Sequence, residues 1–141
     1  MANEAVLVIE TELPINFTCS NTTGIEKGSL LKLSDPMTVA IVATDNDIVG
    51  GIAAEEKIAS DGKTKIAVYR GGFFKVRASG SITVGDPLSI EGDTINTLKS
   101  TAAQTGANFS GSKVWGISME TCTESETFLF ELRPSCQVGI T

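Results

Sequence analysis

The feature that most constrains the fold of this chain is a short pattern of glycine and aliphatic residues that occurs twice. Three segments of the first half align with three segments of the second half: residues 25–33 (IEKGSLLKL) with 82–90 (ITVGDPLSI), 49–55 (VGGIAAE) with 114–120 (VWGISME), and 64–70 (TKIAVYR) with 127–133 (TFLFELR). Two copies are too few for a solenoid. The repeat therefore predicts one compact β-barrel or sandwich with an internal pseudo-twofold relation between halves of about 25–72 and 82–135. Two separate lobes are the alternative.

The spacing of turn residues predicts an all-β protein. The 14 glycines and turn segments such as SDPM, TDND, SDGK and EGD separate short runs rich in strand-forming residues. Alternation within many runs is imperfect, which is typical of strands covered on both faces. We expect strands over residues 5–9, 29–33, 38–43, 48–53, 64–69, 73–78, 87–90, 94–98, 113–119 and 127–132, and helix-compatible composition occurs only over 98–106.

Composition excludes several classes of function. The 141 residues are enough for one domain with a sizeable core. The chain has no histidine, which excludes Ser-His and Cys-His catalysis and removes the commonest zinc ligand. Its net charge is −6 and it has no basic run, so we expect no nucleic-acid partner. No apolar run approaches the roughly 20 residues that span a bilayer, and the start lacks a basic signal region. We expect no membrane partner and no export.

Gly62, Lys63 and Thr64 match the end of a phosphate-binding loop, but the loop's first glycine is missing. The pattern needs a glycine five positions before the Gly-Lys pair, where Lys57 stands. The aligned segment of the second half, TESETFLFEL, has no Gly-Lys pair yet keeps the strand that follows. We interpret Asp61-Gly62 as a hairpin turn and expect no bound nucleotide.

Other patterns that resemble reactive sites are incomplete. Asp45 and Asp47 resemble the start of a calcium loop, but its glycine and distal glutamate do not follow in register, so we interpret both as turn formers. Glu55 and Glu120 occupy matching positions and suggest an acid–base pair, although a solvated rim explains them better. Residues 82–93 resemble a strand of lipoyl- and biotin-carrying domains but lack the acceptor lysine at the tip. We expect no enzyme, and no catalytic residue, cofactor or metal.

Several residue types are expected to have structural roles. The cysteines have an odd count and no CxxC spacing, so we expect free thiols at Cys19, Cys122 and Cys136. Trp115 is the only tryptophan, and we expect it in the core or at an oligomer interface. The glycines expected at structurally required positions are Gly28, Gly51, Gly71, Gly72, Gly85 and Gly116. The repeat places Gly51 and Gly116 at equivalent backbone positions, where a side chain is expected to clash.

Residues 1–21 precede the repeat, so we expect an extended N-terminal arm followed by a β-rich domain over residues 22–141. The segment NEAVLVIETELPINF combines an apolar, strand-prone run with Pro14. Such a strand is suited to β-augmentation, in which main-chain hydrogen bonds supply affinity. An ordinary edge strand of the domain is an equal alternative. The arm residues expected to make contacts are Asn3, Glu4, Ala5, Val6, Leu7, Val8, Ile9, Leu13, Ile15 and Phe17.

Residues 22–134 contain, in order, GIEKGSLLKLSDP, IVGGIAAEE, DGKTKIAVYRGGFFKV, ITVGDPL, VWGISME and FLFELRP. This order resembles a family of capsid decoration (cement) proteins of tailed bacteriophages and, more distantly, is similar to the head decoration protein of phage lambda. The resemblance implies a β-tulip-like module without catalytic residues. It also implies a homotrimer, or else a dimer, that is made in the host cytoplasm and binds the outer capsid surface of the virion. There it would bridge major capsid protein subunits, with residues 2–17 as the capsid-contacting arm.

A carbohydrate-binding or adhesion β-module on a virion or cell surface is the alternative function. Such sites usually expose aromatic side chains, and a chain with one Trp and one Tyr offers few. A small acid–base enzyme comes third.

Overall fold

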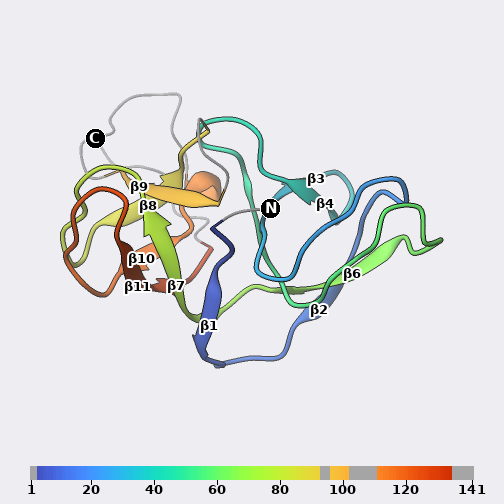
Figure 1. Cartoon of the computed structure of the whole chain (residues 1–141), viewed down its shortest axis with the longest axis horizontal. Coiled ribbons are helices and arrows are strands. Elements are labelled where there is room, and N and C mark those ends of the chain that lie inside the picture. Colours follow the sequence, from blue (N-terminus) through green and yellow to red (C-terminus); the bar gives the residue numbers. More distant parts are fainter. Residues whose placement is uncertain (1–2, 93–95, 102–110, 135–141) are drawn as a thin grey trace.

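The computed structural model describes residues 3–92, 96–101 and 111–134, which form eleven β-strands and one short 3-10 helix (Figure 1). The strands are β1 (Val6–Ile9), β2 (Ile15–Thr18), β3 (Leu30–Ser34), β4 (Thr38–Ile41), β5 (Val49–Ala53), β6 (Lys65–Tyr69), β7 (Gly72–Ala78), β8 (Pro87–Ile90), β9 (Thr97–Ser100), β10 (Gly116–Ser118) and β11 (Thr127–Leu132), and the helix is η1 (Gly111–Lys113). The prediction of an all-β fold is confirmed.

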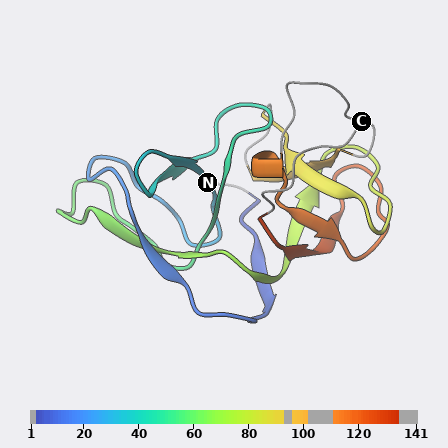
Figure 2. The ribbon, with the colours of Figure 1, turned by 180° about the vertical axis from the view of Figure 1, so that it is seen from behind.

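The strands close into two β-barrels, which lie side by side along the long axis of the molecule (Figures 1 and 2). The first barrel has the strand order β2-β4-β3-β5-β6, with β2 and β4 parallel and β6 closing on β2. The second has the order β7-β11-β10-β8-β9 and closes through the parallel pair β7–β9. The two rings have the same order when the second is read in the opposite direction: β2, β4, β3, β5 and β6 correspond to β7, β9, β8, β10 and β11. The remaining strand, β1, adds to the outside of β7.

The sequence predicts one compact barrel, whereas the structure has two, and each barrel contains one half of the repeat. The aligned segments of the repeat form corresponding strands: β3 and β8, β5 and β10, and β6 and β11. Each half of the repeat supplies four strands, and the strand that precedes it, β2 or β7, completes the five-stranded ring through a parallel pair. Neither barrel needs a strand of the other. A pseudo-twofold relation between the barrels stays a prediction.

The two barrels pack through a shared hydrophobic core. The larger buried cluster joins Leu30, Val49 and Ile52 of the first half to the aromatic side chains of the second barrel. Trp115 belongs to this cluster and is fully buried. Its side chain therefore lies in the core and is not available at a subunit interface. A smaller cluster around Phe17 fills the first barrel.

Polar contacts also join the barrels at this junction. The N–H of Leu30 in the first barrel donates to Oδ1 of Asn96 at 2.9 Å, and this bond is buried. Asp45 accepts a hydrogen bond from the N–H of Gly92 at 2.6 Å and lies 3.2 Å from Nζ of Lys99. The Gly92 bond is the main cause of a lowered pKa at Asp45. Asp45 therefore connects the two barrels, a role beyond the turn former that the sequence predicts.

The N-terminal strands form a long antiparallel ribbon with the chain that connects the barrels. β2 pairs with β6 in the first barrel, and β1 pairs with β7 in the second (Figure 1). Two glycines lie where the ribbon crosses the junction. A Cβ on Gly71 would overlap Oε1 of Glu12, and a Cβ on Gly72, which has φ of +127°, would lie 3.1 Å from the carbonyl oxygen of Ile9. The absence of a side chain at Gly72 lets the backbones of the two ribbon segments approach closely, whereas the flexible Glu12 side chain is free to rotate away from a Cβ on Gly71.

The prediction of an extended arm over residues 1–21 needs correction. In the described part of this segment, β2 is a full member of the first barrel, and Phe17 is buried in its core. β1 is an edge strand, which agrees with the alternative interpretation from the sequence. The physical reason is register: both strands find backbone partners about fifty or more residues away in the chain, and local patterns carry no information about such pairing.

Smaller differences concern single elements. β2 is absent from the sequence prediction, which places residues 15–18 in the arm. β9 begins at Thr97, later than expected, and the stretch expected to be a strand over 113–119 is β10 preceded by η1. Most of the helix-compatible segment 98–106 lies outside the described residues. Within the described part of the chain, no helix has the length and apolar character needed to cross a bilayer.

Candidate functional site

Five aliphatic side chains near the N-terminus are exposed, and we call them the aliphatic strip: Val6, Val8, Ile9, Leu13 and Ile15. Each is between 48% and 78% exposed. They follow one another along β1, the connecting loop and the start of β2, which together form one border of the molecule (Figure 1). Single exposed aliphatic residues are ordinary, whereas larger contiguous apolar patches mark interaction surfaces. Here five exposed aliphatic residues lie within ten positions of the chain.

The strip includes the one free sheet edge among the described strands. Every other strand has a neighbour on both sides, whereas β1 pairs only with β7. Free edges tend to recruit other strands, and proteins limit this with bulges and charged residues. Here the register shifts between Leu7 and Ile9, and Glu10 and Glu12 follow directly. These features limit indiscriminate pairing at the edge.

Buried residues of the same segment hold the strip in place. Ala5 is buried, and its N–H donates to the carbonyl oxygen of Gly28 at 2.9 Å. Leu7 packs against the shared core, and Phe17 lies in the core of the first barrel. Asn3 accepts a hydrogen bond from Arg77 at 3.4 Å. Of the predicted contact residues, five form the exposed strip, Ala5 and Phe17 are buried, and Asn3, Glu4 and Leu7 are partly buried, so the strip is held in place by its own segment. That these residues contact a capsid stays a prediction.

The Gly62-Lys63-Thr64 triplet lies in the turn between Lys57 and β6, as the sequence predicts, and has its own internal partners. The N–H of Gly62 donates to Oδ1 of Asn21 at 2.7 Å, and the N–H of Lys63 donates to Oδ1 of Asp61 at 2.9 Å. The bond from Lys63 is the main cause of a lowered pKa at Asp61. These amides are occupied and do not form an open cradle for phosphate.

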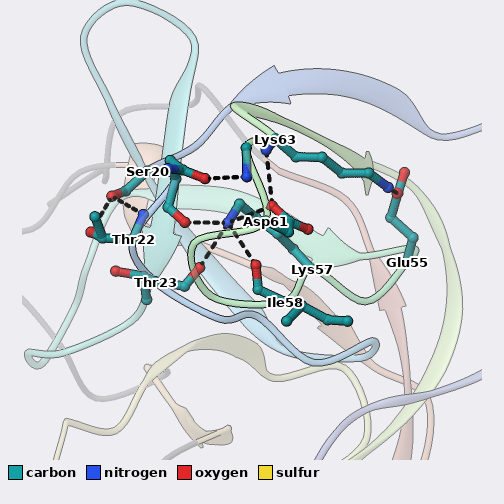
Figure 3. A network of polar contacts seen from close by, with 10 residues as sticks. Ser20, Thr22, Thr23, Glu55, Lys57, Ile58, Asp61 and Lys63 are labelled. Atoms are coloured by element: carbon teal, nitrogen blue, oxygen red, sulfur yellow. Dashed lines mark hydrogen bonds and ion pairs between the residues drawn. The ribbon is translucent and has the colours of Figure 1, made fainter.

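A buried lysine organises this turn (Figure 3). The side chain of Lys57 is 1% exposed, and its ammonium donates to the carbonyl oxygens of Asn21, Thr23 and Ile58 at 2.8, 3.2 and 3.2 Å. Asp61 lies 3.5 Å away and supplies the opposite charge. Three donors with three acceptors leave the ammonium fully satisfied. Its role is to hold two loops of the first barrel together. Sequence reasoning missed it, because an isolated lysine carries no signal of burial.

The two repeated glutamates have matching structural roles. Glu55 accepts a hydrogen bond from the N–H of Ala67 at 3.1 Å, and Glu120 accepts one from the N–H of Leu129 at 2.7 Å. In each half the carboxylate therefore binds the backbone of the last barrel strand. Asp47 accepts bonds from the N–H groups of Ala43 and Thr44, as expected of a turn former. Among the described residues, no group of three or more Cys, Asp or Glu side chains is arranged to hold a metal ion.

The described cysteines are free and buried, and we predict that they are unreactive in the folded protein. Burial raises the pKa of both the Cys19 and the Cys122 thiol, so both stay protonated at neutral pH. Cys136 lies outside the described residues. In a Cys136→Ser variant, labelling with a thiol-reactive disulfide should be at least about tenfold slower in buffer than in denaturant, since the thiolate is the reactive form. Fast labelling of the folded variant would contradict this.

Comparison with known proteins finds one family model and a solved structure of similar fold. A family model described as phage cement protein matches residues 9–133. Among solved structures, the head fiber gp8.5 N base of bacteriophage phi29 has a TM-score of 0.53 and 21% sequence identity, covering 89% of this chain and 99% of that chain. At this identity the likeness concerns the fold alone. No curated protein matches the chain.

Proposed function

This chain belongs to the phage cement protein family, whose function is to decorate and stabilise the capsid, and on that premise we propose that the aliphatic strip is its capsid-binding surface. In this proposal the protein binds the outer surface of the head and bridges neighbouring major capsid protein subunits. The observation that carries it is the coincidence of five exposed aliphatic side chains with the free edge of β1.

The chemistry of the strip supports a stable contact. Burying one aliphatic side chain completely contributes about 1.5–3 kcal/mol, so partial burial of five supplies a useful share of a binding free energy. Unpaired backbone groups on β1 add main-chain hydrogen bonds to an incoming strand. Because β1 and β2 are already anchored to the barrels, little conformational entropy is lost on binding.

The net charge supports the outer location, and an oligomer suits the bridging role. A net charge of −6 is repelled by packaged DNA, which favours the outside of the shell. We propose a homotrimer, with a dimer as the other option, because linked copies convert several modest contacts into one strong attachment. Binding to the native shell alone raises its stability by mass action.

The surface offers little to a carbohydrate. The single Trp is buried, the hydroxyl of Tyr69 donates to Glu10 at 3.1 Å, and no aromatic side chain among the described residues is highly exposed. The alternative of a glycan-binding module therefore gains no support.

The proposal predicts that charges in the strip abolish attachment without unfolding the protein. Deleting residues 2–17 is unsuitable, because it removes β2 from a closed barrel. The double variant Val8→Glu, Leu13→Glu places two carboxylates on exposed positions instead. It should co-sediment with heads lacking this protein at least about tenfold more weakly than wild type, equivalent to about 1.4 kcal/mol. Heads mixed with the double variant should also lack the rise in melting temperature that the wild-type protein produces.

The matched control is Ile58→Glu, which alters an aliphatic residue of similar exposure in the turn shown in Figure 3, outside the strip. All variants should melt in denaturant within about 0.5 kcal/mol of wild type, as surface changes do. Equal binding by the double variant and the control would exclude the strip as the contact. Failure of wild type to bind matched heads would refute the proposed capsid contact itself.

A further inference from the structure

The first barrel contains a glycine turn, residues 26–29, that is covered by an extended segment. The N–H of Gly28 donates to the carbonyl of Ala53 at 2.9 Å, and Gly28 has φ of +90°. On the outer side, the N–H of Ala5 donates to the carbonyl oxygen of Gly28 at 2.9 Å. A Cβ on Gly28 would lie only 2.5 Å from the carbonyl oxygen of Ala5. The backbone of the N-terminal segment thus lies directly against the glycine.

The second barrel has the same turn at residues 83–86, and nothing in the described part of the chain covers it. The N–H of Gly85 donates to the carbonyl of Ser118 at 2.8 Å, and its φ is also +90°. The reciprocal bonds match as well, from Ala53 to Ser29 at 2.9 Å and from Ser118 to Asp86 at 3.0 Å. Yet Gly85 is exposed, and a Cβ there would meet no atom within 4 Å. Among the described residues, no backbone N–H donates a hydrogen bond to its carbonyl oxygen. This turn is therefore an open counterpart of the one that Ala5 covers.

Two exposed apolar side chains flank the open turn. Val84 is 57% exposed and Met119 is 36% exposed, and they lie next to Gly85 and Ser118, which the turn's hydrogen bond joins. The N–H of Val84 also donates to Oγ1 of Thr121 at 3.0 Å, which fixes the turn against the following loop. In the covered turn the position of Val84 is taken by Lys27. The open site therefore suits an extended segment with aliphatic side chains.

We propose that the turn at residues 83–86 binds an extended apolar strand of the major capsid protein, whose backbone N–H donates to the carbonyl of Gly85. The assignment of this strand to the major capsid protein rests on the proposed function. A second copy of this chain is a poor occupant, because the segment that fits such a turn is already used internally: Ala5 is 7% exposed and continues into β1, which pairs with β7. With the aliphatic strip as a separate contact, one copy holds the shell at two places.

Site-specific photo-crosslinking on decorated heads tests this assignment. The photo-crosslinking amino acid p-benzoylphenylalanine replaces Val84 in one protein and Lys27, at the equivalent position of the covered turn, in the other. After binding to heads that lack the protein and irradiation, the label at position 84 should crosslink to a segment of the major capsid protein, identified by mass spectrometry. The label at position 27 should give little such product. In parallel, the double variant Val84→Asp, Met119→Glu should bind heads roughly tenfold more weakly while melting like wild type.

The outcomes separate this inference from the function on which it rests. If both labelled proteins bind the heads but position 84 yields no capsid adduct, the inference is wrong and the capsid function stands. Adducts between two copies of this chain would assign the turn to a copy–copy contact and also overturn it. If unmodified protein fails to bind the heads, the proposed function fails instead. Unchanged affinity of the double variant for the heads would likewise overturn the site.

Discussion

Replacing Gly51 or Gly116 by alanine is expected to lower the free energy of unfolding by about 3 kcal/mol, the sum of backbone strain and overpacking. Gly51 has φ of +141° and Gly116 has φ of +153°, which side chains rarely adopt. A Cβ on Gly51 would overlap the carbonyl oxygen of Tyr69, and a Cβ on Gly116 would overlap that of Glu131. Both obstacles are backbone atoms of the neighbouring strand, so no rotamer change relieves the overlap.

Denaturant melts of the two variants measure this effect, and Gly80→Ala is the matched control. Gly80 also has a positive φ of +77°, but a Cβ there would meet nothing within 4 Å. Its substitution therefore isolates the conformational cost, about 1–2 kcal/mol. If Gly51→Ala and Gly116→Ala lose no more stability than Gly80→Ala, the close approach to the neighbouring strand has no energetic consequence.

Replacing Lys57 by methionine should also cost about 3 kcal/mol, the typical result of breaking a buried charged network. Methionine keeps most of the side-chain volume but leaves the carbonyls of Asn21, Thr23 and Ile58 without their shared donor. Each buried acceptor that loses its hydrogen bond costs about 1–3 kcal/mol, reduced where water reaches it. Asp61 keeps partial contact with water, so its lost ion pair adds little.

Lys63→Met is the control for this prediction, because it removes the same charge from the same turn. The side chain of Lys63 is exposed, and its ion pair with Glu55 is 4.0 Å long, so its loss should stay within about 0.5 kcal/mol. Both variants are compared with wild type by denaturant melts at neutral pH. Equal stabilities of Lys57→Met and Lys63→Met would show that the buried ammonium is not needed to hold the loops.

Several properties of this protein follow from its sequence because they depend on short-range patterns. Turn residues and short β-branched runs predict an all-β chain, since strand and turn preferences act within a few residues. The alignment of Gly51 with Gly116 identified two positions that share a positive φ and a carbonyl neighbour. The missing glycine at position 57 excluded a phosphate loop, and the amides of that turn indeed have internal partners.

Tertiary structure alone decided how the strands close and which side chains they bury. β1 pairs with β7, and β2 pairs with β6. A segment whose local sequence predicts a free arm therefore completes the first barrel and adds an edge strand to the sheet of the second. Lys57 forms an isolated β-bridge with Ile25, and Cys122 forms the corresponding bridge with Ile82. Only Lys57 adds side-chain hydrogen bonds that join two loops. Register and burial of this kind arise from contacts between residues far apart in the chain, whose loop-closure cost and packing no local pattern encodes.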